Sequence, residues 1–185
     1  MTRTAIVTGA ASGIGAATVL ELARQGYRTV GIDVSLDGAR ASAREATQLN
    51  AERHHAIHAD VTDEARLIEA FDESLAFLGH LDVLVTSAGI AETTPFMDLT
   101  VEAFRTVNEV NVIGTFVCIR EAAKRMQPGA RICTVASVAG IRGGGLSGTA
   151  AYAASKGAVL ALTRMRRARS RPKASASTRS RQARR

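Results

Sequence analysis

A glycine-rich turn directly after the first apolar run constrains this chain more than any other feature of its sequence. Gly9, Gly13 and Gly15 follow residues 5–7, and a segment with helical periodicity begins there. Glycine lets the backbone turn sharply and come close to a ligand, and the free N–H groups of the first helical turn favour negative charge. Because strand, turn and helix occur together, we predict a dinucleotide-binding βαβ unit rather than a plain strand-to-helix turn.

Strands and helices alternate along the first 164 of the 185 residues. Apolar runs predict strands at 5–7, 29–32, 56–59, 83–85 and 131–135. Helical spacing of apolar residues predicts helices at about 16–23, 38–53, 63–78 and 100–127, and a last helix from about residue 150, after a glycine-rich loop at 140–148. This alternation predicts an α/β fold of the three-layer Rossmann type, a doubly wound parallel sheet with helices on both faces.

The net charge of +7 comes from the last segment of the chain and not from its body. Residues 1–164 hold 15 Lys and Arg against 17 Asp and Glu, which gives −2, and residues 165–185 hold nine Lys and Arg and no acid, which gives +9. A weakly acidic body gives no reason to expect nucleic-acid binding. We therefore expect a domain at 1–164 and a basic, disordered tail at 165–185, which has too few apolar residues to fold.

Other features of the sequence point to a cytoplasmic protein without a metal site. No apolar run reaches the length of a membrane-spanning helix, and the N-terminus has no signal-peptide pattern. The only cysteines, Cys118 and Cys133, lie in apolar surroundings, which favours a reducing compartment over a disulfide framework. The histidines lack acidic or cysteine partners at ligand spacing, so we interpret them as ordinary surface residues: His54, His55, His58 and His80.

An acidic residue at the end of the second predicted strand bears on the choice of cofactor. Asp33 lies eighteen residues after Gly15, where a carboxylate accepts hydrogen bonds from the adenosine ribose of a dinucleotide. A carboxylate there repels a 2′-phosphate, and neither Ser12 nor the pair Val34-Ser35 is a basic residue that would attract one. The sequence therefore favours NAD over NADP.

Tyr152 and Lys156 are four residues apart on the last predicted helix and share a face. A phenol with a pKa of about 10 is a poor base at neutral pH. An ammonium about 4 Å away contributes ~4 kcal/mol at an effective dielectric constant near 20, which brings the phenol into working range. Such a tyrosine can exchange a proton with a substrate oxygen during hydride transfer. Alone, this spacing is common and indicates no more than a surface pair.

Further motifs in matching order make the chain resemble the classical short-chain dehydrogenase/reductase family. The resemblance runs from about Thr4 to Arg164. Its motifs are TGAASGIG at 8–15, Asp60-Val61, Asn111 in NVIG, Ser137 in ASVAG and YAASK at 152–156.

The resemblance implies hydride transfer between a nicotinamide cofactor and a small secondary alcohol or ketone. It implies that Tyr152 is the general acid/base and that Lys156 lowers its pKa and binds the nicotinamide ribose. It also implies that Ser137 binds the reacting oxygen, that Asn111 positions a water linking Lys156 to solvent, and that the helices of Asn111 and Tyr152 can form a homo-oligomer. The implied cofactor-binding residues are Gly9, Ser12, Gly13, Ile14, Gly15, Asp33, Asp60, Val61, Ser87, Ala88, Gly89, Tyr152 and Lys156.

The chain departs from the family pattern in three places. TSAG at 86–89 replaces the usual NNAG, so Ser87 stands where an asparagine normally ties down the central strand. The loop between Ser137 and Tyr152 is long and carries three consecutive glycines. The family's later strands, nicotinamide-contacting turn and substrate-covering loop have no counterpart in 165–185, and we expect a frameshift or truncation near residue 165.

Three functional hypotheses follow. The motif set favours an NAD-dependent oxidoreductase. The missing segment favours an inactive truncated remnant that at most binds nucleotide. The basic tail would allow nucleic-acid or acidic-surface binding, but it lacks aromatic residues and any recognition motif, so no specific nucleic-acid partner is expected.

Overall fold

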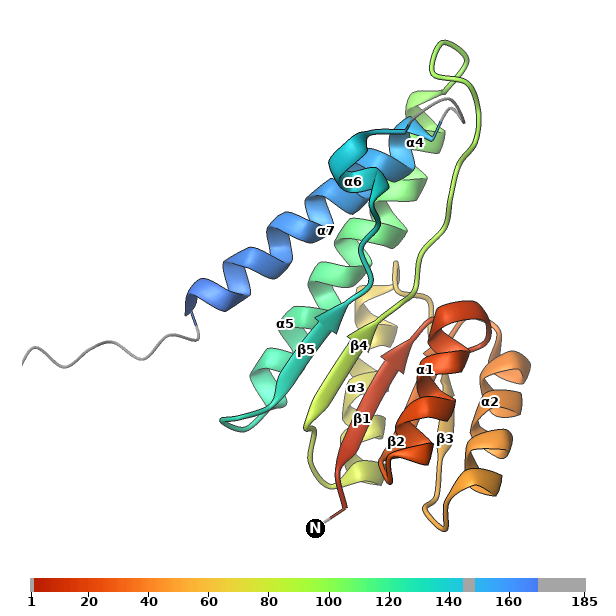
Figure 1. The fold of residues 1–185 in the computed structure, drawn as a ribbon, viewed down its shortest axis with the longest axis vertical. Coiled ribbons are helices and arrows are strands. Elements are labelled where there is room, and N and C mark those ends of the chain that lie inside the picture. Colours follow the sequence, from red (N-terminus) through yellow and green to blue (C-terminus); the bar gives the residue numbers. More distant parts are fainter. Residues whose placement is uncertain (1, 145–148, 170–185) are drawn as a thin grey trace, which may run out of the picture.

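Five parallel strands form one sheet in the order β3-β2-β1-β4-β5. The structure, a computed structural model, describes residues 2–144 and 149–169, with only the helical backbone for 165–169. Among these residues β3 and β5 form the two edges of the sheet (Figure 1). The strands are β1 (Thr4–Thr8), β2 (Arg28–Asp33), β3 (His55–His58), β4 (Val83–Thr86) and β5 (Arg131–Thr134).

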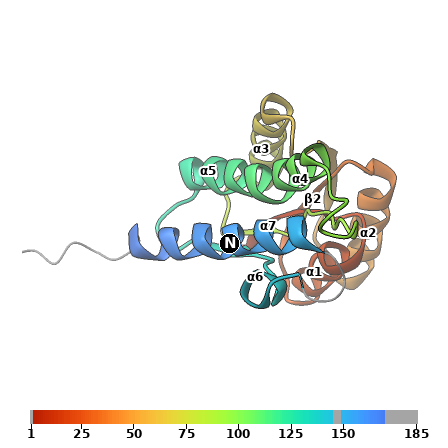
Figure 2. The same ribbon diagram turned by 90° about the horizontal axis from the view of Figure 1, so that it is seen from above.

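Helices cover both faces of the sheet, which confirms the three-layer, doubly wound architecture. Figures 1 and 2 show α1 and α2 on one face and α3 and α5 on the other. The helical elements are α1 (Gly13–Arg24), α2 (Leu36–Leu49), α3 (Glu64–Leu78), α4 (Val101–Asn108), the π-helical segment η1 (Glu109–Gly114), α5 (Thr115–Arg125), α6 (Ala139–Arg142) and α7 (Ala150–Arg169).

Residues 5–7 of β1 and 83–85 of β4 are apolar because both faces of these strands are covered, whereas buried threonines stand at the strand ends. Neighbouring residues of β1 point to opposite sides, so Ile6 joins the cluster under α3 and α5, whereas Val7 joins the cluster under α1. Phe71, from α3, is fully buried in the first cluster, and Val19, from α1, is buried in the second. Two separate apolar clusters therefore pack the two faces of the sheet against their helices.

Helix α2 ends at Leu49, before the boundary near residue 53 that its composition suggested. Asn50 takes an extended conformation, and its side-chain amide donates hydrogen bonds to the carbonyls of Ala23 and Tyr27, at 2.7 and 3.2 Å. These contacts with residues distant in sequence end the helix and let β3 begin at His55, one residue earlier than expected.

The predicted helical stretch at 100–127 is one continuous run whose middle has π-helical geometry. Helix α4 passes into η1 and then α5 without a break. Gly114, the last residue of η1, lies so close to Val61 that a Cβ there would come within 2.7 Å of the valine side chain. This close packing brings η1 against the loop that follows β3.

Two features lie near the C-terminal end of the described chain. Helix α6 forms at the start of the segment predicted as a glycine-rich loop, and α7 continues to Arg169, past the expected domain boundary at 164. The rest of the expected tail, 170–185, lies outside the described residues. Within the described ranges, no helix is long and apolar enough to cross a membrane, and no three His, Cys, Asp or Glu residues gather as metal ligands.

A buried carboxylate ties α5 to its surroundings. Glu121 is 1% exposed, yet it accepts hydrogen bonds of 2.6–2.8 Å from Arg125, Lys124 and Arg120. Burial alone would raise the pKa of Glu121, but these three cations outweigh it and lower the pKa to about 2. Arg125 also binds Asp72 of α3 at 2.7 Å, so the cluster links two helices.

Replacing this carboxylate should change the pH dependence of stability. A group whose pKa falls from 4.5 to about 2 on folding stabilises the fold above about pH 4.5 and loses that contribution as the pH falls toward 2. We expect Glu121→Gln to lower the free energy of unfolding by ~2–3 kcal/mol at pH 7. In urea titrations, the difference from the wild type should shrink steadily between pH 5 and 2. A difference that stays constant across that range would contradict this account.

Candidate active site

A cavity of about 580 Å³ opens at the carboxyl ends of the strands. It spans the point where the strand order reverses, between β1 and β4, which is where ligands bind in open α/β sheets. The predicted cofactor-binding residues that line it are Gly9, Ser12, Gly13, Ile14, Asp33, Asp60, Val61, Ser87, Ala88, Gly89, Tyr152 and Lys156.

The three glycines of the turn after β1 perform different tasks. Gly9 has a φ of +71°, and a Cβ on it would come within 2.6 Å of the backbone nitrogen of Ala88. Gly13 also has a positive φ, of +52°, but meets no atom within 4 Å and therefore leaves the cavity open. Gly15 lines no part of the cavity, but a Cβ on it would overlap the carbonyl of Gly9. The first and third glycines allow close packing, and the second provides space.

The N-terminus of α1 is open toward the cavity. Ser12 occupies the N-cap position in an extended conformation, but its side chain makes no capping hydrogen bond, and the first turn holds no acidic residue. The N–H groups at the start of a helix have no partner within the helix, and the helix dipole places partial positive charge there. This terminus can therefore accept a phosphate group.

Two carboxylates stand at the rim next to this terminus. Asp33 accepts hydrogen bonds from the backbone N–H groups of Ala11 at 2.9 Å and Ser35 at 2.8 Å. Asp60 accepts one from Thr62 at 2.8 Å. These backbone contacts orient each side chain and leave acceptor lone pairs on the carboxylate oxygens for a ligand.

Lys156 is held in the cavity without an acidic partner. The residue is 5% exposed, and its Nζ donates to the carbonyl of Val135 at 2.8 Å. The same Nζ lies 5.6 Å from the centre of the Tyr152 ring, so the predicted pair does share one face of α7. Burial lowers the pKa of Lys156. No salt bridge to this lysine occurs among the described residues.

Asn111 lies behind the cavity and connects its walls. It is fully buried in η1; its Oδ1 accepts from the backbone N–H of Ile90 at 2.8 Å, and its Nδ2 donates to the carbonyl of Ile90 at 2.9 Å. Nδ2 donates its other hydrogen to the hydroxyl oxygen of Ser155 at 2.9 Å, and that hydroxyl donates to the carbonyl of Tyr152 at 2.7 Å. Asn111 thus joins the loop after β4 to α7.

Ser137 lies between β5 and α6 and does not line the cavity. Its Oγ accepts from the backbone N–H of Ala139 at 3.2 Å. The following helix is pressed against α7, because a Cβ on Gly140 would come within 2.6 Å of the backbone of Gly157. This glycine contact sets the position of the Ser137 loop relative to the helix that carries Tyr152 and Lys156.

Sequence reasoning missed several residues of the site. Ser155 gave no signal of its own, because serine beside a charged residue is common on helices. The carbonyl of Val135 acts through its backbone, which no side-chain pattern reveals. The cavity is also lined by residues adjacent to predicted positions, at strand ends and in the loop after Gly89, and these were not singled out: Ile32, Val34, Ala59, Ile90, Ala91, Val110 and Val135.

Comparison with known proteins places the chain in a family. A family model described as short chain dehydrogenase matches residues 3–174. Sorbitol dehydrogenase of Cereibacter sphaeroides is 37% identical over 87% of this chain and 62% of its own length. Cis-4-hydroxycyclohexanecarboxylate dehydrogenase of Sinomonas cyclohexanicum is 41% identical over 88% of this chain and 65% of its own length. The chain belongs to the short-chain dehydrogenase/reductase family, and it spans less than two thirds of these relatives.

Solved structures agree with this assignment. NAD⁺-bound xylitol dehydrogenase superposes with a TM-score of 0.84 at 30% identity, over 89% of this chain and 63% of that one. A short chain dehydrogenase from Burkholderia cenocepacia in complex with NADP superposes with a TM-score of 0.83 at 33% identity, over 88% of this chain and 66% of that one. Neighbours of this chain therefore include complexes with either dinucleotide.

The close approach of Gly9 to Ala88 can be tested against a glycine with the same backbone but no neighbour. Gly26 has a φ of +80° and nothing within 4 Å of the position of a Cβ. Both Gly9→Ala and Gly26→Ala should lose ~1–2 kcal/mol from the strained backbone, and Gly9→Ala should lose more because its methyl group displaces the backbone at 87–88. Amide chemical shifts of residues 87–89 should move only in Gly9→Ala. Equal destabilisation in the two variants would show that the contact contributes nothing.

Proposed function

We propose that this chain is an oxidoreductase that transfers hydride between NAD and a small secondary alcohol or ketone, with Tyr152 as the acid/base. The observation that carries the proposal is the placement of Lys156, buried and without a salt bridge to any described residue, beside Tyr152 in the same cavity as the glycine turn and Asp33. This arrangement supports an active site over an inactive remnant, because the described residues still bring the proposed acid/base, the lysine and the cofactor-binding residues to one cavity.

The cavity fits a dinucleotide at several points. The open N-terminus of α1 and the space over Gly13 suit the pyrophosphate. Asp33 would accept the ribose hydroxyls next to adenine, and Asp60 with Val61 would contact the adenine. The phosphates and the nicotinamide half would be flanked by Ser12, Ile14, Ser87, Ala88 and Gly89. Gly15 would pack against the glycine turn on the side away from the cavity. Bound NAD would supply or accept the hydride.

The residues of the chain would handle the proton. In the reduction direction, the Tyr152 hydroxyl donates its proton to the substrate oxygen as that oxygen gains negative charge. The ammonium of Lys156 stabilises the tyrosinate that remains, and burial strengthens this effect because water screens the charge less. Ser137 would donate a hydrogen bond to the reacting oxygen.

Asn111 would position a water that connects Lys156 to solvent. Both hydrogens of its side-chain amide are already engaged, with Ile90 and Ser155. The water would therefore have to donate to a free lone pair of Oδ1 or to a nearby backbone carbonyl. Because both amide hydrogens and the oxygen of Asn111 have partners, the side-chain amide has a single orientation.

The proposed setting of the protein rests on charge and on the thiols. Cys118 and Cys133 are both free, which supports a reducing, cytoplasmic compartment. A small-molecule alcohol or ketone is the proposed partner. A specific nucleic acid is not, because residues 1–164 carry a net charge of −2 and residues 165–185 lack aromatic residues and a recognition motif. Self-association through the helices of Asn111 and Tyr152 remains part of the proposal.

The choice of NAD over NADP can be tested at Asp33. Removing the carboxylate in Asp33→Ala should weaken NAD binding about tenfold, because hydrogen bonds to a charged group are lost. NADP binding should change less, since the repulsion of its 2′-phosphate is removed as well. Dissociation constants for both dinucleotides, from fluorescence titration of the reduced forms, give the ratio directly. An equal loss for NAD and NADP would contradict the proposal.

The role of Tyr152 can be tested by removing only its hydroxyl. We expect Tyr152→Phe to keep NADH affinity within about twofold and to lower kcat by about 10²–10⁴-fold, because proton transfer is lost while the ring is retained. Sorbitol, xylitol and cis-4-hydroxycyclohexanecarboxylate, which appear in the names of the relatives, are a suitable first substrate set. Tyr27→Phe, at a tyrosine outside the cavity, is the matched control. Absence of NADH binding by the wild type would favour the inactive remnant instead.

A further inference from the structure

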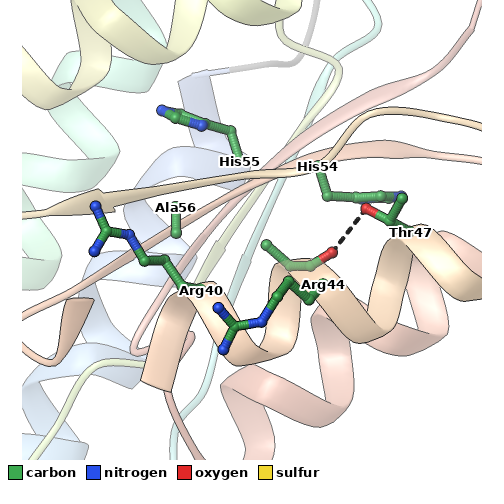
Figure 3. A pocket seen from close by; sticks show the side chains of 7 residues that line it. Arg40, Arg44, Thr47, His54, His55 and Ala56 are labelled. Carbon is green, nitrogen blue, oxygen red and sulfur yellow. Dashed lines mark hydrogen bonds between the residues drawn. The ribbon is translucent and has the colours of Figure 1, made fainter. Parts of the chain in front are cut away.

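A second cavity, of about 210 Å³, lies where α2 runs beside the edge strand β3. Its lining includes residues 54–56 at the start of β3, so it lies near the amino end of that strand, away from the cavity at the carboxyl ends. Figure 3 shows Arg40 and Arg44 extending from consecutive turns of α2 on the same side of β3, with Ala56 above them. The lining residues are Arg40, Ala43, Arg44, Thr47, His54, His55 and Ala56.

The positive charge of this cavity is not neutralised by its surroundings. None of its lining residues is acidic. Arg44 makes no ion pair or side-chain hydrogen bond within the described ranges, and Arg40 has only a 3.7 Å contact with Asp37, a side chain that is 98% exposed. Such exposed pairs contribute little, because water screens them. Both guanidinium groups are therefore available to an anion.

The carboxylates nearest to the histidines of the cavity are already bound elsewhere. Glu52, close to His54, accepts from Arg28 at 3.2 Å. Glu73, close to His55, accepts from Arg66 at 2.6 Å. Because each of these carboxylates is paired with another arginine, neither neutralises the positive charge of Arg40 and Arg44.

His54 forms a neutral wall of the cavity. Its Nε2 is 2.9 Å from Oδ1 of Asn50, an atom that can only accept, so Nε2 carries the hydrogen. Its Nδ1 then accepts from the hydroxyl of Thr29 at 2.8 Å. Burial lowers the pKa of His54, in agreement with a neutral ring. Both ring nitrogens are used, so the charge of the site comes from α2.

The edge strand adds a backbone donor. Residues of a parallel strand direct their backbone groups alternately toward one neighbour and the other, and Ala59 donates to Asp33 on the β2 side. By this alternation Ala56 and His58 face outward. Arg66 already donates to the carbonyl of His58 at 2.9 Å, so this carbonyl is not free to pair with an added peptide strand. The N–H of Ala56 therefore faces away from β2, in the cavity that Arg40 and Arg44 also line, which suits a small anion.

We propose that Arg40, Arg44 and the N–H of Ala56 form a binding site for a phosphate group. Guanidinium groups bind phosphate oxygens in a planar, two-pronged geometry, and a backbone N–H supplies a further donor. The phosphate group can belong to inorganic phosphate or to a phosphorylated metabolite. The site is independent of the proposed oxidoreductase function, since none of its residues belongs to the cavity at the carboxyl ends.

The test is an NMR titration of the full chain, without dinucleotide, at low ionic strength. Inorganic phosphate, glucose 6-phosphate and unphosphorylated glucose are added separately. We expect saturable shifts of the amides of Thr47 and Ala56 with one or both phosphates and none with glucose, and the tighter of the two phosphates identifies the source. Failure of both phosphates to give saturable shifts would overturn the proposal.

Charge-matched variants separate this site from general attraction to a basic protein. The double variant Arg40→Gln/Arg44→Gln should weaken phosphate binding at least about fivefold, because two charge-assisted contacts are lost. The double variant Arg24→Gln/Arg105→Gln removes two exposed arginines outside the cavity. It should change the affinity for phosphate less than about twofold. Equal weakening in both double variants would show non-specific attraction and would refute the site. Circular dichroism and the melting temperature confirm that each variant is folded.

Discussion

The backbone of Gly9 is the point on which the rest of the site depends. Its N–H donates to the carbonyl of Ile32 at the end of β2, and on its other side it packs against Ala88 beyond the end of β4. Ser87 in turn donates its N–H to Thr8 at 3.1 Å. The ends of three strands are thereby joined around one residue without a side chain. Because a Cβ would collide with this backbone, only glycine permits the arrangement.

On the side of the cavity formed by α7, a network of buried hydrogen bonds fixes the positions of the segments. Asn111 and Ser155 are both fully buried, and each finds its hydrogen-bond partners in the other and in nearby backbone. Buried polar groups are costly unless they are satisfied, so this network allows one relative position of η1 and α7. Lys156 is fixed one residue further along, by the carbonyl of Val135. The positions of Tyr152 and Lys156 therefore depend on hydrogen bonds of Asn111, Ser155 and the carbonyl of Val135, which the four-residue spacing of the tyrosine and lysine does not reveal.

Much of the fold could be predicted from the sequence because short-range patterns reflect burial. The apolar runs at 5–7 and 83–85 predicted β1 and β4 because both faces of these strands are covered, and α1 and α3 lie near their predicted positions because each buries one apolar face. Predictions failed where distant residues decide. Asn50 ends α2 through bonds to Ala23 and Tyr27, and the packing of Gly114 on Val61 accompanies the π-helical segment. Neither contact leaves a local trace in the sequence.

The sequence by itself determined the layered α/β architecture, the family and the residue types that the proposed chemistry requires. Tertiary structure alone decided which of these residues meet. It placed Asp33 and Lys156 in the lining of one cavity and Asn111 outside that lining. It also brought Ser155 to Asn111 and the carbonyl of Val135 to Lys156. It also placed two arginines of α2 beside the free edge of β3. The physical reason is that periodicity and motifs record local preference, whereas hydrogen bonds between distant segments exist only once the strands are side by side.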